Sequence, residues 1–127
     1  APRDFKLADA IVERVLEIIA YFKPKFWFIE NPRGLLQNRN YMKALDKYKH
    51  TITYCSYDKS FPQKPTQIWT NCMDWDKRYE TKENPCENTF INPKTGKLIH
   101  NITVDSLSLC DRYRIPSLLV NTLLDCM

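Results

Sequence analysis

Three consecutive residues, Glu30, Asn31 and Pro32, are the strongest candidates for chemistry in this sequence, and they follow the apolar run FWFI. A carboxylate held at the edge of a dry core can serve as a general acid or as a hydrogen-bond partner for a bound ligand. Pro32 fixes its own backbone and biases Asn31 toward an extended shape, so this short stretch points in a defined direction. The simpler alternative is that Glu30 is a solvated or capping residue at the end of a strand.

The cysteines offer a second kind of chemistry. There are five, an odd number, and no two form a CxxC pair, which favours free thiols in a reducing compartment over a disulfide framework. Cys55 is expected to be a core thiol within a strand. Weak candidates for a zinc site come from the polar part of the chain, but their spacings match no structural zinc pattern, so no metal is expected. These candidates are Cys72, Cys86, His100 and Cys110.

The net charge of +4 permits an anionic partner but does not require one. Basic residues gather loosely in sequence around Glu30, where they suit phosphate contacts, although a solvated helix face explains the lysines of MKALDKYK equally well. They are Arg33, Arg39, Lys43, Lys47, Lys49, Lys59 and Lys64. Gly34 and Gly96 are the only glycines, so no glycine-rich nucleotide loop can be built from this chain.

The elements that must position these residues alternate between helix and strand. Apolar spacing predicts a helix over 7–22, and Pro24 ends it. A buried strand is predicted over 25–30, a short helix over 38–49, strands over 50–57 and 66–71, an irregular segment over about 72–105, and a last helix over 115–127. This order indicates one α/β domain over 1–127 with an at least partly parallel sheet. Glu30 then lies at the carboxyl end of a strand, where such sheets bind ligands.

Three blocks in this order, FWFIENPRGLL, TYCSYDKSFPQKPTQIWTN and DRYRIPSLLVNTLL, together resemble a known family. They look like the C-terminal two thirds of the catalytic domain of cytosine-C5 DNA methyltransferases, above all the phage and large-virus type, in which a strand ends in Glu-Asn-Val or Glu-Asn-Pro. The resemblance implies part of a class I S-adenosylmethionine-dependent, Rossmann-like domain that is incomplete at the N-terminus. The irregular segment would then correspond to variable target-recognition material.

The resemblance also implies roles for individual residues. Glu30 would bind N3 and the exocyclic amine of a cytosine flipped out of the duplex, Asn31 would orient the loop, and Pro32 would stiffen it. Gln63 matches the first residue of the family's Gln-x-Arg-x-Arg motif, but Pro65 and Gln67 stand where the arginines belong. Lys64 is then the candidate cation at the base, although its point charge is no substitute for a planar fork. Tyr57 is followed by Asp58 instead of the family's glycine.

The family's other catalytic elements are not expected in this chain. The S-adenosylmethionine loop and the nucleophilic Pro-Cys pair both precede the glutamate block in the family, whereas Pro85-Cys86 follows it. The sequence therefore predicts part of a DNA (cytosine-5-)-methyltransferase, inactive alone, whose cofactor site lies mostly outside the chain. The expected partners are double-stranded DNA and the missing N-terminal part or a complementary subunit, without a membrane. The expected location is intracellular: host cytoplasm, nucleus or viral particle.

Two other interpretations stay open. The chain could be a catalytically dead methyltransferase-fold module for nucleic-acid binding or assembly, which the lost arginines favour and the retained Glu30-Asn31-Pro32 disfavours. It could also be an unrelated small α/β protein in which Glu30 only ends a strand.

Overall fold

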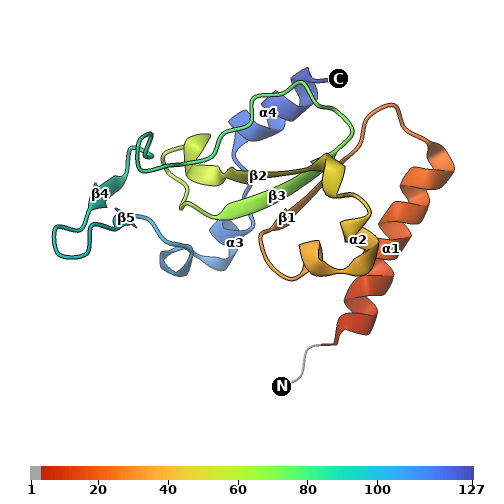
Figure 1. The fold of residues 1–127 in the computed structure, drawn as a ribbon, viewed down its shortest axis with the longest axis horizontal. Coiled ribbons are helices and arrows are strands. Elements are labelled where there is room, and N and C mark those ends of the chain that lie inside the picture. The colour runs from red at the N-terminus through yellow and green to blue at the C-terminus, as the bar shows by residue number, and fades with distance from the viewer. Residues whose placement is uncertain (1–3) are drawn as a thin grey trace.

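The computed structural model describes residues 4–127 and shows a mixed α/β chain with two small sheets. Figure 1 gives the arrangement. Four α-helices are formed by Phe5–Phe22 (α1), Asn40–Lys43 (α2), Leu109–Arg112 (α3) and Ser117–Asp125 (α4). Five strands are formed by Phe28–Pro32 (β1), Lys49–Thr53 (β2), Pro65–Thr70 (β3), Thr89–Ile91 (β4) and Leu98–His100 (β5). The mixed α/β class that the sequence predicts is confirmed.

The central sheet has the order β1-β3-β2, and both of its strand pairs are antiparallel. Because β1 and β2 each run opposite to β3, they run parallel to one another without touching, so the predicted parallel pairing is wrong. The reason is the link over 54–64, which is shorter than the dozen or more residues that a parallel crossover needs. It returns the chain as β3 between the two earlier strands.

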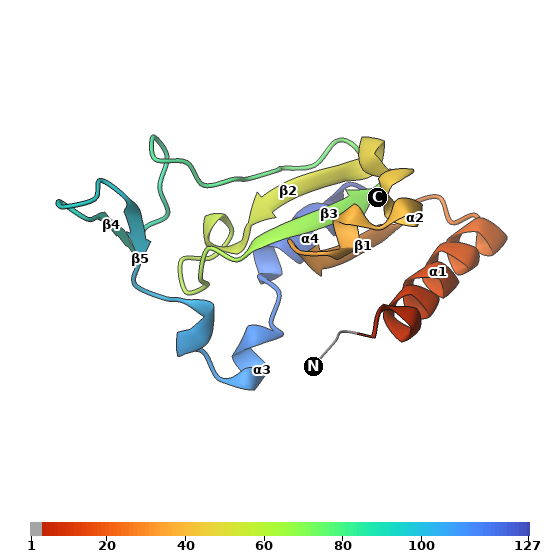
Figure 2. The same cartoon turned by 60° about the horizontal axis from the view of Figure 1, so that its bottom comes forward.

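The core lies between this sheet and α4, which Figures 1 and 2 show along one face of the strands. Leu119 of α4 is fully buried and packs in one cluster with Ile52 of β2 and Ile68 of β3. Tyr54 belongs to the same cluster and is also fully buried. The predicted final helix is confirmed over Ser117–Asp125, with Pro116 as its N-cap residue. The one-turn helix α3 was not predicted.

Helix α1 confirms the predicted helix over 7–22 and begins two residues earlier, where the Asp4 side chain accepts a hydrogen bond from the Lys6 amide at 3.0 Å. None of its described residues is buried, although its apolar stripe is wide. Large apolar side chains stand in solvent at Leu7, Ile11, Ile18 and Phe22. Figure 2 shows α1 at one side of the sheet. An 18-residue amphipathic helix with an uncovered stripe is a surface that another body should cover.

The short helix predicted over 38–49 is instead a series of tight turns around α2. Its apolar residues Met42, Leu45 and Tyr48 recur every three positions, which matches the three residues per turn of a 3₁₀ helix. The Leu45 amide donates to the Met42 carbonyl and the Tyr48 amide to the Leu45 carbonyl, both at 2.9 Å. The predicted strand over 50–57 likewise ends at Thr53, and Tyr54–Ser56 form a further 3₁₀ turn.

The segment over about 72–105 is largely irregular, as predicted, but contains the hairpin β4–β5. Gly96, with φ of 67°, supplies the left-handed turn residue of this hairpin. The prediction of free thiols is wrong for four of the five cysteines, because disulfides join Cys55 to Cys86 and Cys72 to Cys126. Cys110 remains free and exposed. Within residues 4–127, no helix is both long and apolar enough to cross a bilayer.

Candidate active site

The Glu30 carboxylate lies in β1 opposite Ile68 of β3, and its side chain is exposed rather than set in a dry core. Its Oε1 accepts a hydrogen bond of 2.8 Å from the Tyr54 hydroxyl. Within residues 4–127, no donor contacts its second oxygen, Oε2. The result is a carboxylate fixed at one oxygen and open at the other, which is the state that a hydrogen-bonding ligand requires.

Tyr54 is the positioning residue that sequence reasoning missed. It is fully buried in the core beneath β1, and it reaches Glu30 because the chain leaves the strand at Thr53 and turns. Burial, and then the negative charge of Glu30, raises the pKa of the Tyr54 hydroxyl far above its ordinary value, so Tyr54 stays protonated and remains a donor. A buried tyrosine needs a partner for its hydroxyl. That requirement was the one sequence signal that could have pointed to Tyr54.

Asn31 and Pro32 shape the backbone beside Glu30 and do not join it. Successive strand residues face opposite sides of a sheet, so Asn31 shares a face with Gln67 while Glu30 shares one with Ile68. The Asn31 amide donates to the Pro32 carbonyl at 2.8 Å. The Arg33 amide then donates to the Pro65 carbonyl at 2.9 Å, which pins the end of β1 against the start of β3. These contacts suit the orienting and stiffening roles predicted for this pair.

Of the three predicted DNA-binding side chains, two lie at the Glu30 end of the sheet and one does not. Arg33 is exposed directly after β1. The Lys64 ammonium donates to the Arg112 carbonyl at 2.6 Å and lies 5.1 Å above the Tyr54 ring, so it is coupled to the residue that holds Glu30. Gln63 instead turns its amide toward Glu80, at 3.1 Å from Oε1.

Gln67, which stands at the position of the second missing arginine, makes hydrogen bonds within the chain. Gln67 of β3 accepts a hydrogen bond from Thr51 at 2.7 Å and donates one to Gln37 at 3.2 Å. Gln67 therefore has its own partners on the face opposite Glu30, and no guanidinium replaces the lost fork there.

The four weak zinc candidates do not come together. Cys72 is joined to Cys126, and Cys110 lies exposed in α3. Cys86 is joined to Cys55, while His100 contacts Glu80. Of the four candidates, only Cys86 and His100 lie in one region of the structure. The residues that connect them there are Cys55 and Glu80. Pro85-Cys86 lies in this network and not beside Glu30, in line with its interpretation as coincidence.

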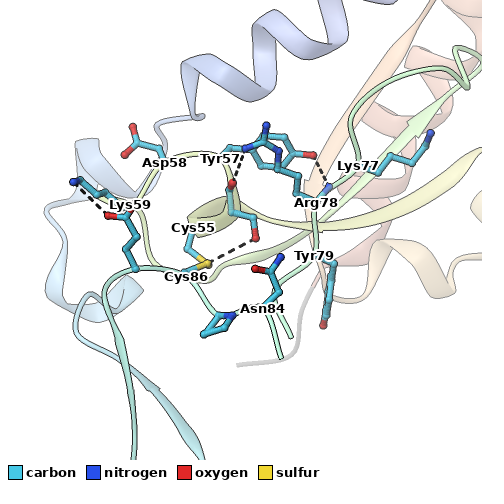
Figure 3. A pocket seen from close by; sticks show the side chains of 12 residues that line it. Cys55, Tyr57, Asp58, Lys59, Lys77, Arg78, Tyr79, Asn84 and Cys86 are labelled. Carbon is cyan, nitrogen blue, oxygen red and sulfur yellow. Dashed lines mark hydrogen bonds and ion pairs between the residues drawn. A yellow bond between two sulfur atoms is a disulfide. The ribbon is translucent and has the colours of Figure 1, made fainter. Parts of the chain in front are cut away.

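A hollow of about 690 Å³ lies away from Glu30. Figure 3 shows it with the joined Cys55 and Cys86 in its wall and basic side chains around it. Most of these cations already have partners: Arg78 pairs with Asp76 at 2.7 Å and Lys59 with Glu87 at 3.4 Å. Burial raises the pKa of Tyr57, in the same wall, to about 12. This surface is polar and internally satisfied, which makes it a weaker ligand site than its size indicates.

Comparison with known proteins bears on the Glu30 end directly. The chain is 28% identical over 122 residues to a probable DNA (cytosine-5)-methyltransferase of Frog virus 3 (isolate Goorha), an alignment that covers 91% of this chain. The resemblance to the cytosine-C5 DNA methyltransferase family is confirmed. The chain spans 56% of the length of that curated methyltransferase. No family model matches the sequence, and no solved structure matches it.

Proposed function

We propose that this chain is the glutamate-bearing portion of a DNA (cytosine-5-)-methyltransferase and that the Glu30 end of the central sheet binds a cytosine flipped out of double-stranded DNA. The observation that carries the proposal is the exposed Glu30 carboxylate, held at Oε1 by the buried Tyr54 hydroxyl at 2.8 Å. Its free oxygen can meet the N3 side of the ring, where protonation or hydrogen bonding makes C5 nucleophilic after a thiolate has added to C6. Similarity to the frog virus methyltransferase supports this assignment.

Lys64 and Arg33 complete the proposed base-binding end. The Lys64 ammonium is fixed over the Tyr54 ring, and Arg33 follows the glutamate block with an exposed side chain. The Lys64 ammonium and the exposed Arg33 guanidinium can contact phosphate or a base oxygen, although neither takes the place of the arginines that the family's strand carries. Gln63 is withdrawn from this role because Glu80 engages its amide.

We expect S-adenosylmethionine to bind mostly outside residues 4–127. The hollow next to Asn31, between α1 and the turns around α2, has a volume of about 190 Å³, below the ~300 Å³ at which small-molecule pockets begin. The larger hollow is lined by lysines and an arginine, and no glycine lines it. We therefore place the cofactor and the nucleophilic thiol in a complementary portion, and we derive no step through them here.

That complementary portion would cover the two surfaces that the chain leaves open. One is the apolar stripe of α1, and the other is the outer edge of β1, which no strand within residues 4–127 occupies. An open strand edge is a template for pairing with another chain. Docking there would place the missing elements beside Glu30, and the chain alone is expected to transfer no methyl group.

The test is methylation of cytosine in duplex DNA by the chain alone and by the chain mixed with the portion of the frog virus methyltransferase that the alignment leaves out. Activity is expected only in the mixture. Glu30→Gln should lower the turnover of the active assembly roughly 10²–10⁴-fold, because the amide cannot supply a proton. Glu83→Gln, a change of an exposed glutamate in the irregular segment, is the matched control and should leave turnover unchanged. Full activity of a folded Glu30→Gln assembly would overturn the assignment.

The second candidate is a catalytically dead module for nucleic-acid binding or assembly. The observation that favours it is Gln67, which stands in an arginine position and is bound to Thr51 and Gln37. If this candidate is right, the chain binds duplex DNA, loses binding when Arg33 or Lys64 is changed to alanine, and gains no methylation from any complementary portion.

A further inference from the structure

The second glutamate network of this chain centres on Glu80, whose residue is 3% exposed. Its Oε1 lies 2.6 Å from His100 Nε2 and accepts a hydrogen bond from the Gln63 amide at 3.1 Å. Its Oε2 accepts a hydrogen bond from the Cys86 amide at 2.7 Å. The backbone amide of Glu80 is in turn tied to Thr53 Oγ1 at 2.9 Å. A buried carboxylate is oriented at both oxygens in an otherwise irregular segment.

Two sulfur atoms meet this carboxylate. Cys55 Sγ lies 3.5 Å from Glu80 Oε2, and Cys86 Sγ is bonded to Cys55 Sγ. The ligand atoms of Cys55, Glu80 and His100 all lie within 4.8 Å of one another. In a tetrahedral zinc site with Zn–S of about 2.3 Å and Zn–N of about 2.0 Å, neighbouring ligand atoms stand roughly 3.5 Å apart. Cys55, Glu80 and His100 are thus already close to that spacing, and Cys86 is attached to Cys55.

We propose that Cys55, Cys86, Glu80 and His100 form a structural zinc site in the reduced protein. Two thiolates, one imidazole and one carboxylate are a ligand set that suits Zn²⁺, and hard cations such as Mg²⁺ and Ca²⁺ prefer oxygen alone. Gln63 and Thr53 orient Glu80 from behind, as outer contacts do for metal ligands. With all four positions filled by protein, the site is closed and serves stability, not catalysis.

The segment that this site would hold has little regular structure of its own to stabilise it. Between β3 and α3 the regular elements are two three-residue strands and one 3₁₀ turn, and strands this short need support to be stable. The four ligands come from separate places: the turn after β2, the loop at 80–86, and the end of β5. One ion would therefore pin the β4–β5 hairpin and its loop to the central sheet. Regions with little core of their own are commonly stabilised in this way.

The large hollow of Figure 3 provides an entry path. Cys55 and Cys86 both line it, whereas Glu80 is not among its lining residues. A metal ion or a reductant arriving in this hollow meets the sulfur atoms first. An entry path is one of the requirements for a metal site, and here it is present on the sulfur side.

Conversion of the disulfide into a zinc site takes two steps. The disulfide between Cys55 and Cys86 takes up two electrons and two protons from a thiol reductant, which is oxidised to its own disulfide, and two thiols result. Zn²⁺ then binds both sulfurs as their two protons leave to solvent, with the Glu80 carboxylate and the neutral His100 imidazole as the other ligands. The same four residues thus support a disulfide when oxidised and a metal site when reduced.

The test uses the full chain, reduced with a phosphine, freed of metal and dialysed against Zn²⁺. Elemental analysis is expected to give one zinc per chain, and Co²⁺ in its place should give the visible bands of a tetrahedral site together with thiolate-to-cobalt charge-transfer absorption. Cys55→Ser and Cys86→Ser should remove the charge-transfer intensity in part and weaken zinc binding at least tenfold. His100→Gln, a change at a partly exposed position that leaves the thiols in place, should weaken it roughly 10–100-fold.

Cys110→Ser is the matched control, since Cys110 is the free, exposed cysteine of α3, and it should bind zinc like the unmodified chain. Far-UV circular dichroism checks that each variant folds. Fewer than one zinc per several folded, reduced chains, or equal affinity in the unmodified chain, Cys55→Ser and His100→Gln, would overturn the proposal and leave the disulfide as the only link. No DNA or cofactor enters the measurement, so its outcome is separate from that of the methyltransferase proposal.

Discussion

Glu30 and Glu80 carry the same side chain but lie in very different surroundings. Glu30 stands exposed in the middle of β1 and receives one hydrogen bond, from Tyr54 at 2.8 Å. Glu80 is buried in an irregular segment, where His100, Gln63 and the Cys86 amide all contact its oxygens. The regular part of the fold thus holds a carboxylate with one hydrogen-bond partner, and the irregular part holds one with partners at both oxygens.

The difference indicates which carboxylate serves function and which serves stability. A buried carboxylate is tolerated only when partners replace its lost hydration, so the Glu80 contacts chiefly stabilise the local fold. An exposed carboxylate needs no partners, and one that is nevertheless fixed by a buried hydroxyl is positioned for something outside the chain. Glu30 is the one that a ligand can reach.

The sharpest way to break this comparison is to truncate each glutamate. Glu80→Ala should lower the free energy of unfolding by about 3 kcal/mol or more, because it leaves a half-buried imidazole and buried donors without their acceptor. Glu30→Ala should cost only about 1 kcal/mol, for the lost partner of the Tyr54 hydroxyl. Urea unfolding of both variants at one pH measures the difference. Equal losses would mean that the two carboxylates do not divide stability and function.

Tyr54→Phe tests whether Tyr54 positions Glu30 for catalysis. The ring stays in the core, so the free energy of unfolding should fall by only about 1 kcal/mol. In the active assembly, turnover should fall roughly tenfold to a hundredfold because Glu30 is no longer held in place. The KM for DNA should stay within a factor of two, which separates a positioning role from a loss of fold. Adding Tyr54→Phe to Glu30→Gln should cost little more than Glu30→Gln alone.

Acid should weaken the fold through a histidine outside both networks. Burial, and to a smaller extent the charge of Lys77, lowers the pKa of His50 below its ordinary value of 6.5. The unfolded chain therefore binds this proton more readily, and stability is lost as the pH falls from about 6.5 toward the folded-state pKa. The urea midpoint should be lower at pH 5.5 than at pH 7.5. His50→Gln should flatten this part of the pH dependence; an unchanged slope would assign it to other groups.

The smallest effect is expected where α1 meets the rest of the chain. Asp9 accepts hydrogen bonds from Arg39 Nε at 3.0 Å and from the Tyr41 hydroxyl at 2.6 Å. The Arg39 bond first, and the Tyr41 bond second, lower the pKa of Asp9. Asp9→Asn should barely move the urea midpoint but should speed amide hydrogen exchange along α1, measured against Glu13→Gln on the same helix. Unchanged exchange in Asp9→Asn would show that other contacts hold the helix.

Local patterns predicted the parts of this fold that local physics determines. The apolar stripe of α1 and the Pro116 start of α4 both appear at the expected places. The predicted strand over 25–30 is shifted to Phe28–Pro32, so the expectation that Glu30 ends a strand is wrong. The β1-β3-β2 order was beyond reach, because the alternation within a strand says nothing about its neighbour. The same limit hid the cysteine pairs, whose partners lie 31 and 54 residues apart.

The residues of the candidate site were likewise predictable only where the signal is local in sequence. Glu30 was identifiable because an apolar run, a carboxylate and a proline are adjacent in sequence. Tyr54 falls inside the strand predicted over 50–57, and only the turn after Thr53 directs its hydroxyl to Glu30. Glu80 carried no sequence signal at all: its partners Gln63 and His100 are 17 and 20 residues away, on opposite sides of it.

The insertion of β3 between β1 and β2 has a consequence for synthesis. As the chain leaves the ribosome, α1, β1 and β2 emerge before β3, and β1 and β2 have no direct pairing to make with each other. Only when 65–70 has emerged can either strand gain its hydrogen bonds. Until then the nascent chain presents an uncovered helix stripe and two unpaired strands, and this is the interval in which a chaperone or a complementary chain finds the most surface to hold.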